Sequence, residues 1–269
     1  MRADLALVER GLARSRNHAS SLIEAKRVLV NGKEVKKSSQ LIEPEAKLIV
    51  LDAVEYVSRA GHKLAKALEQ FAELDIQGSI CLDVGASTGG FTDVLLRAGA
   101  AQVVAIDVGH DQMVEELRQN PRVICLEGVN AREMTLETLN ARTRRKYDEE
   151  SFNVVVADVS FISLTLVLPA LASVAPKADM VLLIKPQFEV GIDSLNATGI
   201  VNDHRLRASA ITQVVDCATT LGFGIRGLVK SELPGTHGNI EYLLWISSAQ
   251  ERNASKWTDE IEAIAREGK

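Results

Sequence analysis

The chain has 269 residues, of which 46% are hydrophobic, and its formal net charge is -5 at pH 7. This length is typical of one large domain accompanied by a small one. No apolar run approaches the ~20 residues that a membrane helix needs, and the charged N-terminus lacks a signal-peptide pattern. Because Cys81, Cys125 and Cys217 are isolated and without metal-ligand spacing, we expect a cytoplasmic protein with free thiols and no metal site.

The charge is unevenly distributed along the chain. Residues 1–37 contain nine Lys and Arg against four Asp and Glu, whereas the remaining residues contain 22 against 32. A basic N-terminal segment ahead of an acidic body indicates that the segment binds a polyanion. The alternative is an ordinary solvated helix face.

The first elements in chain order form a small α+β unit. We expect a helix over 2–10, a second helix capped by Ser15, a hairpin around Asn31-Gly32 and a strand near 48–51. Asn-Gly between β-forming residues is a strong hairpin signal. We place this first domain at residues 1–57 and a short linker at 58–62.

A larger domain follows at residues 63–250, in which apolar strands alternate with helices. After a helix over 61–71, the expected strands are 80–84, 102–107, 122–127, 152–157, 179–185, 223–230 and 240–247. The expected helices lie near 90–98, 111–119, 133–141, 163–173 and 203–221. Such alternation predicts an α/β fold with a mainly parallel, Rossmann-like sheet covered on both faces.

The last two strands are joined by residues 231–239 without a helix, so we expect them to be antiparallel. A seventh strand inserted antiparallel separates the methyltransferase sheet from the dehydrogenase sheet. Residues 251–269 are polar and predict a C-terminal helix.

The glycine-rich turn after the first strand of the large domain indicates a cofactor site. Its spacing, Gly85 and then Gly89-Gly90, lacks the first doublet of the dinucleotide fingerprint, and the turn contains no Lys or Arg to balance a phosphate. Asp83 precedes the turn, and Asp107 ends the next strand, where a carboxylate accepts from ribose hydroxyls. An acidic, glycine-lined pocket suits S-adenosylmethionine, which has a sulfonium and an amine. The predicted cofactor contacts are Asp83, Gly85, Ala86, Ser87, Thr88, Gly89, Gly90, Phe91, Asp107, Val108, Glu127, Asn130 and Asp158.

Four charged residues are predicted to meet beside this turn. Asp158 and Lys185 end two apolar strands, Glu241 opens the antiparallel strand, and Lys63 begins the helix before the sheet. Ligands of open α/β sheets bind beyond the carboxyl ends of the strands. A charged residue at the end of an apolar strand is costly unless it is paired. A structural ion-pair network is the alternative to a catalytic set.

The N-terminal unit resembles the S4 RNA-binding domain. The resemblance lies in Arg2, the run Leu-Val-Glu-Arg-Gly-Leu, Ser15-Arg16 and Val30-Asn31-Gly32. It implies recognition of structured RNA through phosphate contacts, which supply affinity with little sequence choice. The RNA contacts that we expect are Arg2, Arg14, Arg16, Lys26, Arg27, Lys33 and Arg59.

The charged set resembles the Lys-Asp-Lys-Glu tetrad of FtsJ-type ribose 2'-O-methyltransferases. Together with the S4-like unit, the motifs SRAGHKL, LDVGASTGGFTD, ADVSFISL, IKPQFE and GNIEYL resemble the TlyA (haemolysin A) family of rRNA cytidine 2'-O-methyltransferases. The resemblance implies ribosomal RNA or ribosomal subunits as partners and S-adenosylmethionine as the only cofactor, without a metal. It implies Lys185 as the base, Asp158 as its orienting partner, and Lys63 and Glu241 as residues that position the ribose.

Three other functions are alternatives, of which a dehydrogenase is disfavoured by the glycine spacing. The family's second name implies a haemolysin or other membrane-active protein, although the chain has neither a secretion signal nor a membrane span. A ribosome-binding assembly factor without catalysis is the third alternative, and the intact tetrad counts against it. The sequence does not indicate the oligomeric state.

Overall fold

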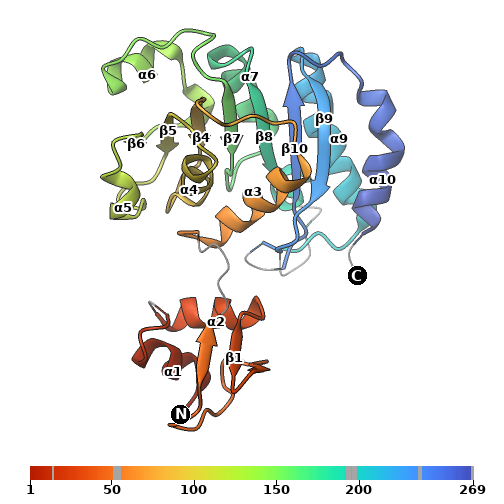
Figure 1. The fold of residues 1–269 in the computed structure, drawn as a ribbon. Coiled ribbons are helices and arrows are strands. Elements are labelled where there is room, and N and C mark those ends of the chain that lie inside the picture. The colour runs from red at the N-terminus through yellow and green to blue at the C-terminus, as the bar shows by residue number, and fades with distance from the viewer. Residues whose placement is uncertain (14, 51–55, 192–194, 196–198, 236–237, 268–269) are drawn as a thin grey trace. The chain divides into compact units, whose positions relative to one another are not determined.

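The chain divides into two compact units, Met1–Glu55 and Tyr56–Lys269, each described here by itself (Figure 1). The computed structural model describes residues 1–13, 15–50, 56–191, 195, 199–235 and 238–267. The division differs from the expected boundary at 57 and linker at 58–62. The backbone N–H of Val57 donates to Asp93 of the large unit at 3.1 Å, and residues 59–62 form the first turn of a helix.

The small unit has two helices and a three-stranded antiparallel sheet in the order β2-β1-β3. Ser15 caps the second helix by accepting from the backbone N–H of His18 at 3.2 Å. Asn31 and Gly32 both have positive φ, as a tight hairpin turn requires. The elements are α1 (Ala3–Glu9), α2 (Arg16–Glu24), β1 (Val28–Val30), β2 (Lys33–Glu34) and β3 (Leu48–Val50).

A buried carboxylate, Asp4, ties two arginines of the small unit together. Its oxygens lie 3.0 Å from Arg2 Nε and 3.1 Å from Arg16 Nη2. The hydrogen bond from Arg2, helped by Arg16, lowers the pKa of Asp4 to about 2. The two arginine side chains are still 43% and 59% exposed, so their outer edges remain open to a ligand.

The large unit contains a seven-stranded sheet in the order β6-β5-β4-β7-β8-β10-β9. Strands β4 to β8 are parallel to one another, and β10 lies antiparallel between β8 and β9. The predicted fold class is therefore confirmed. The strands are β4 (Ile80–Val84), β5 (Gln102–Asp107), β6 (Val123–Glu127), β7 (Val154–Ala157), β8 (Asp179–Ile184), β9 (Gly224–Lys230) and β10 (Tyr242–Ser247).

Helices cover both faces of this sheet, as Figure 1 shows. One face packs against α3, α4 and α5, and the other against α6, α7, α9 and α10. The helices are α3 (Arg59–Gln70), α4 (Gly90–Arg97), α5 (Glu115–Arg118), α6 (Leu136–Thr143), α7 (Leu164–Val174), α8 (Pro186–Glu189), α9 (His204–Thr220) and α10 (Thr258–Arg266), with short 3-10 turns at η1 (Ala131–Glu133) and η3 (Ala254–Trp257). Burial on both faces explains why the strands are continuous apolar runs.

Two helices differ from the expectation. The helix expected over 111–119 is only the four residues of α5. The C-terminal helix is not a separate polar appendage, because Ile261 and Ala265 are buried in the core of the large unit. The buried Arg207 of α9 holds it there by donating to the Ala265 carbonyl at 2.7 Å.

The Asp4 ion pairs make a testable contribution to the stability of the small unit. The pKa of this carboxyl is about 2 in the folded chain and about 3.9 in an unfolded one. Its stabilisation is therefore present above pH ~4 and is lost as the pH falls through about 2. We expect Asp4→Asn to lower the urea midpoint at pH 7, followed through the NMR signals of Leu7 and Ile23, and to have little effect near pH 2. An equal decrease at both pH values would contradict this account.

Candidate active site

The strand register brings the predicted charged residues to one edge of the sheet. Tyr242 of β10 pairs with Ile184 of β8 in antiparallel register. Glu241, the residue before Tyr242, and Lys185, the residue after Ile184, therefore lie at the same edge of the sheet. Asp158 follows β7, which runs parallel to β8 beside it, and leaves at that edge too.

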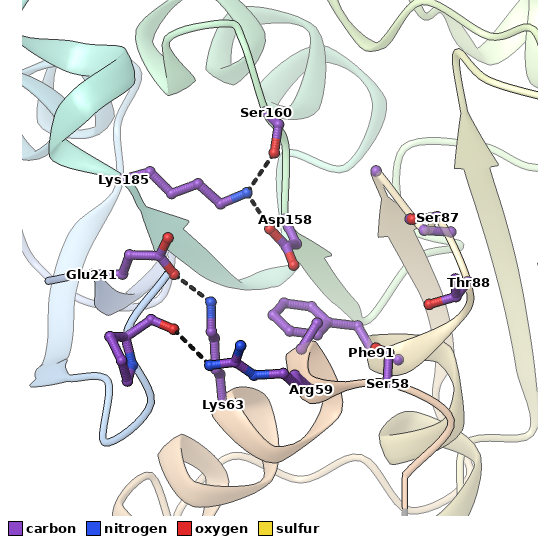
Figure 2. Close-up of a pocket in the computed structure, with 15 residues that line it drawn as sticks. Ser58, Arg59, Lys63, Ser87, Thr88, Phe91, Asp158, Ser160, Lys185 and Glu241 are labelled. Atoms are coloured by element: carbon purple, nitrogen blue, oxygen red, sulfur yellow. Dashed lines mark hydrogen bonds and ion pairs between the residues drawn. The ribbon is translucent and has the colours of Figure 1, made fainter. Parts of the chain in front are cut away.

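Two ion pairs link these residues (Figure 2). Lys185 Nζ lies 2.6 Å from Asp158 Oδ1, and Lys63 Nζ pairs with Glu241 Oε2. The side chains of both lysines are only 10% exposed, and that of Glu241 is 3% exposed. Neither pair is therefore a loose surface contact. Removing one member of such a buried pair typically costs about 3–5 kcal/mol of folding stability.

The position of Lys63 depends on a close approach between α3 and the start of α4. A Cβ on Gly61 of α3 would lie 2.9 Å from the carbonyl oxygen of Gly90, and one on Gly90 would lie 2.1 Å from Ser58 Oγ. Only glycine permits such contacts at both positions. Leu64, the next residue of α3, is fully buried against the sheet. The helix is thus fixed along the edge where Glu241 emerges.

The glycine turn between β4 and α4 is packed against the loop that begins at Asp158. Gly85 has a φ of 80°, and a Cβ there would lie 2.5 Å from the carbonyl oxygen of Asp158. Gly89 has a φ of 95°, and a Cβ there would lie similarly close to the side chain of Leu117. Both positions need glycine for conformation and for space. The turn and the Asp158 loop therefore form one rigid wall.

A cavity of about 410 Å³ lies between this wall and α3. Its volume is within the ~300–1,000 Å³ range of small-molecule sites. The lining residues are Ser58, Arg59, Ala60, Lys63, Gly85, Ala86, Ser87, Thr88, Gly90, Phe91, Asp158, Ser160, Lys185, Pro234 and Glu241. All four members of the charged set are included, together with six turn residues from the predicted cofactor contacts.

The lining fits S-adenosylmethionine. The turn presents backbone and the hydroxyls of Ser87 and Thr88, with no cation to attract a phosphate. Behind the turn, Asp83 is fully buried, and one of its oxygens accepts from Thr92 Oγ1 at 2.6 Å while the other has no partner among the described residues. Burial, together with the nearby Asp158 carboxylate, raises the pKa of Asp83 to about 7. A positively charged cofactor above the turn would favour its ionised form.

The remaining predicted cofactor contacts do not line this cavity. Asp107 accepts from the backbone N–H groups of Ser87 at 2.8 Å and Gly109 at 2.7 Å, so it holds the turn from the end of β5. Val108 beside it is 71% exposed.

Glu127 and Asn130 are engaged elsewhere. Glu127 accepts from Arg118 at 2.6 Å, and this hydrogen bond lowers the pKa of the Glu127 carboxyl. The Asn130 side chain accepts from the backbone N–H of Arg132 at the start of η1, and it lines a separate cavity of about 250 Å³. Asp83, which lies behind the turn, and Gly89, which belongs to it, also do not line the larger cavity.

The predicted RNA-binding cations fall into three groups. Lys26 and Lys33 are exposed on the small unit, and Arg27 is half-buried there. Arg2 and Arg16 pair with Asp4, as described above, and Arg14 lies outside the described residues. Arg59 belongs to the large unit, lines the cavity and donates to the Pro234 carbonyl at 3.3 Å.

Four residues that line the cavity were not predicted from the sequence, namely Ser58, Ala60, Ser160 and Pro234, and neither was Phe161, which follows Ser160 without lining the cavity. Ser160 Oγ accepts a hydrogen bond from Lys185 Nζ at 2.7 Å. Phe161 is 91% exposed with a φ of 65°, and its ring lies 5.2 Å from that of Phe188. Ser160 and Phe161 could have been predicted from their place shortly after Asp158, because ligands of such sheets bind beyond the carboxyl ends of the strands. Within the part of the chain that the structure describes, no group of three or more potential metal ligands occurs.

Comparison with known proteins places this geometry in a family. Residues 56–248 match the FtsJ-like methyltransferase model, and residues 1–48 match the S4 domain. The chain is 47% identical to the 16S/23S rRNA (cytidine-2'-O)-methyltransferase TlyA of Mycobacterium tuberculosis, over 94% of this chain and 92% of that protein. It is 40% identical to Hemolysin A of Brachyspira hyodysenteriae, over 90% and 98%. A solved structure described as a hemolysin from Streptococcus thermophilus has a TM-score of 0.73 and 36% identity, covering 98% of this chain and 95% of that one.

The fold, the glycine turn and the charged set define an S-adenosylmethionine-dependent methyltransferase. The chain belongs to the FtsJ-like methyltransferases and, among them, to the TlyA family with its N-terminal S4 domain. The family resemblance and the cofactor expected from the sequence are thus confirmed.

Substitution of Gly85 tests the cofactor wall. We expect Gly85→Ala to weaken S-adenosylmethionine binding at least tenfold in calorimetry, because the added methyl group collides with the Asp158 backbone. Gly78→Ala is the matched control, since Gly78 has a φ of 73° but open space around it. Similar loss of binding in both variants would show that backbone strain alone, and not the contact with Asp158, is responsible.

Proposed function

We propose that this protein transfers the methyl group of S-adenosylmethionine to the ribose 2'-hydroxyl of a cytidine in ribosomal RNA. The observation that most supports this is the convergence of Lys63, Asp158, Lys185 and Glu241 on one cavity beside the glycine turn. The names of the relatives support the choice of cytidine and of ribosomal RNA. Such a substrate would place the protein with the ribosomes in the cytoplasm.

In the proposed reaction, Lys185 removes the proton from the 2'-hydroxyl. When bound, S-adenosylmethionine supplies an electrophilic methyl group beside a positive sulfur. The 2'-hydroxyl is a weak nucleophile and must lose its proton as it attacks, so a base within hydrogen-bond reach accelerates the step. Lys185 Nζ lies in the cavity wall next to the Asp158 carboxylate, which stabilises the ammonium that forms.

The second ion pair positions the ribose. Lys63 and Glu241 face the cavity from α3 and from the start of β10, opposite the glycine turn. A carboxylate accepts from a ribose hydroxyl and an ammonium donates to one, so the pair can hold the sugar in line with the methyl group. Arg59, which lies on the same helix and lines the same cavity, binds the adjoining phosphate in the proposed complex.

Phe161 supports a nucleotide that is turned out of its helix. An aromatic ring that is 91% exposed three residues after Asp158 offers a stacking surface for the target base. Stacking on an aromatic side chain contributes about 1–3 kcal/mol per base. The S4 domain adds phosphate contacts from Lys26 and Lys33, which are both exposed.

Replacement of Lys185 tests the catalytic role. We expect Lys185→Ala to lower methyl transfer from tritiated cofactor to ribosomal subunits or naked rRNA by roughly 10²–10⁴-fold, while cofactor affinity changes little. Lys177→Ala is the matched control, because Lys177 is an exposed lysine paired with Glu150 on the surface. Wild-type activity in Lys185→Ala would contradict the proposed base.

The hemolysin names of relatives suggest membrane lysis as a second function. Across the described residues, no helix is both long and apolar enough to span a bilayer. The same variants separate the two functions. Red-cell lysis that persists in Lys185→Ala, combined with no methyl transfer by the wild-type protein, would contradict the proposal.

Charge removal on the S4 domain tests its role in RNA binding. We expect Lys26→Ala with Lys33→Ala to weaken rRNA binding and to reduce the slope of log K against log salt by roughly 0.7–0.9 for each phosphate that is no longer neutralised. Lys177→Ala with Lys256→Ala serves as a charge-matched control on the large unit, where both lysines are exposed. An unchanged slope in the first double variant would show that Lys26 and Lys33 do not bind phosphate.

A further inference from the structure

Lys185 has two polar partners of different kinds, and its Nζ also lies 5.9 Å from the centroid of the Phe188 ring. Its Nζ lies 2.6 Å from Asp158 Oδ1, which is an ion pair by distance. It also donates a hydrogen bond to Ser160 Oγ at 2.7 Å, whereas the angle at Asp158 Oδ1 does not make a directional hydrogen bond. Both partners line the same cavity.

The two contacts have different physical effects. Attraction between opposite charges depends mainly on distance and leaves the amine free to rotate about its last bond. A hydrogen bond weakens steeply when its angle falls, so it fixes the direction of one N–H. A carboxylate strongly favours the ammonium, and a neutral hydroxyl oxygen that accepts from the ammonium favours it to a smaller degree.

We propose that Ser160 is a positioning residue that orients the amine of Lys185 for proton transfer. The neutral amine has two N–H bonds and one lone pair. With one N–H held by Ser160 and the other beside Asp158, the lone pair is the remaining corner that can receive a proton. The 2'-oxygen then bonds to the methyl carbon, the carbon–sulfur bond breaks, and the hydroxyl proton moves to Lys185 Nζ. This inference rests on the proposed function.

Contacts between the segments that follow Ser160 and Lys185 hold the two residues close to each other. Lys185 is the residue before α8, and Glu189 at the end of α8 accepts from the backbone N–H of Leu164 at 2.9 Å and from Ser163 Oγ. These contacts bind α8 to the start of α7, three residues after Ser160. They hold the end of the loop that contains Ser160 close to the segment that follows the base.

Removal of the hydroxyl tests the proposal. We expect Ser160→Ala to lower kcat roughly 10–100-fold, the equivalent of one hydrogen bond to a charged group, with KM for RNA and for cofactor unchanged. The acid limb of the kcat–pH profile should move to lower pH, because the ammonium loses an acceptor. Ser160→Thr keeps the hydroxyl at an exposed position and should restore kcat to within a few-fold of wild type.

Controls separate orientation from a structural effect. Ser209→Ala removes an exposed serine of α9 and should leave both kcat and its pH profile unchanged. A loss in Ser160→Ala without a shift of the acid limb, or an equal loss in Ser160→Thr, would overturn the proposal. So would wild-type kcat in Ser160→Ala.

A second measurement does not depend on the RNA substrate. If the wild-type protein transfers no methyl group to rRNA, the proposed function fails, but the hydrogen bond between Lys185 and Ser160 can still be tested. Labelling of Lys185 by trinitrobenzenesulfonate can be followed against pH by peptide mass spectrometry. The midpoint should move to lower pH in Ser160→Ala, and an unchanged midpoint would contradict the role of Ser160.

Discussion

The site depends on burying four charges as two pairs at one edge of the sheet. Lys185 with Asp158 and Lys63 with Glu241 are nearly enclosed, and single charges there would be strongly destabilising. The antiparallel β10 makes the second pair available, because it delivers Glu241 to the edge where Lys185 ends β8. An all-parallel sheet would place the start of that strand at the opposite edge.

The glycine turn and α3 also contribute to the burial of the two ion pairs. Gly85 lets the turn touch the Asp158 backbone, and the Gly61–Gly90 approach lets α3 bring Lys63 against Glu241. The cofactor wall and the ion pairs are consequently parts of one packed unit. We infer that a methyl donor held by the turn and a ribose held by the charged set meet without a large rearrangement of this unit.

The sequence predicted most of the fold because both faces of the sheet are buried. Its strands are therefore continuous apolar runs, and charges such as Asp158 and Lys185 mark their ends. The side-chain contacts of the site and of the small unit have no comparable pattern in the sequence. Ser160 resembles any loop serine until the fold brings it to Lys185, and the pairing of Arg2 and Arg16 with Asp4 requires three-dimensional proximity. Asp83 and Glu127 were predicted at the right strand ends, but their side-chain contacts depend on packing that spacing does not show.

The identity of the methylated nucleoside tests the central claim most directly. Wild-type protein would be incubated with labelled S-adenosylmethionine and ribosomal subunits or naked rRNA, and the RNA digested to nucleosides and separated by chromatography with mass detection. The account predicts label in 2'-O-methylcytidine, because the proposed reaction uses Lys185 as a base on a ribose hydroxyl. Label on a nucleobase, such as 5-methylcytidine, or no label in RNA would contradict it.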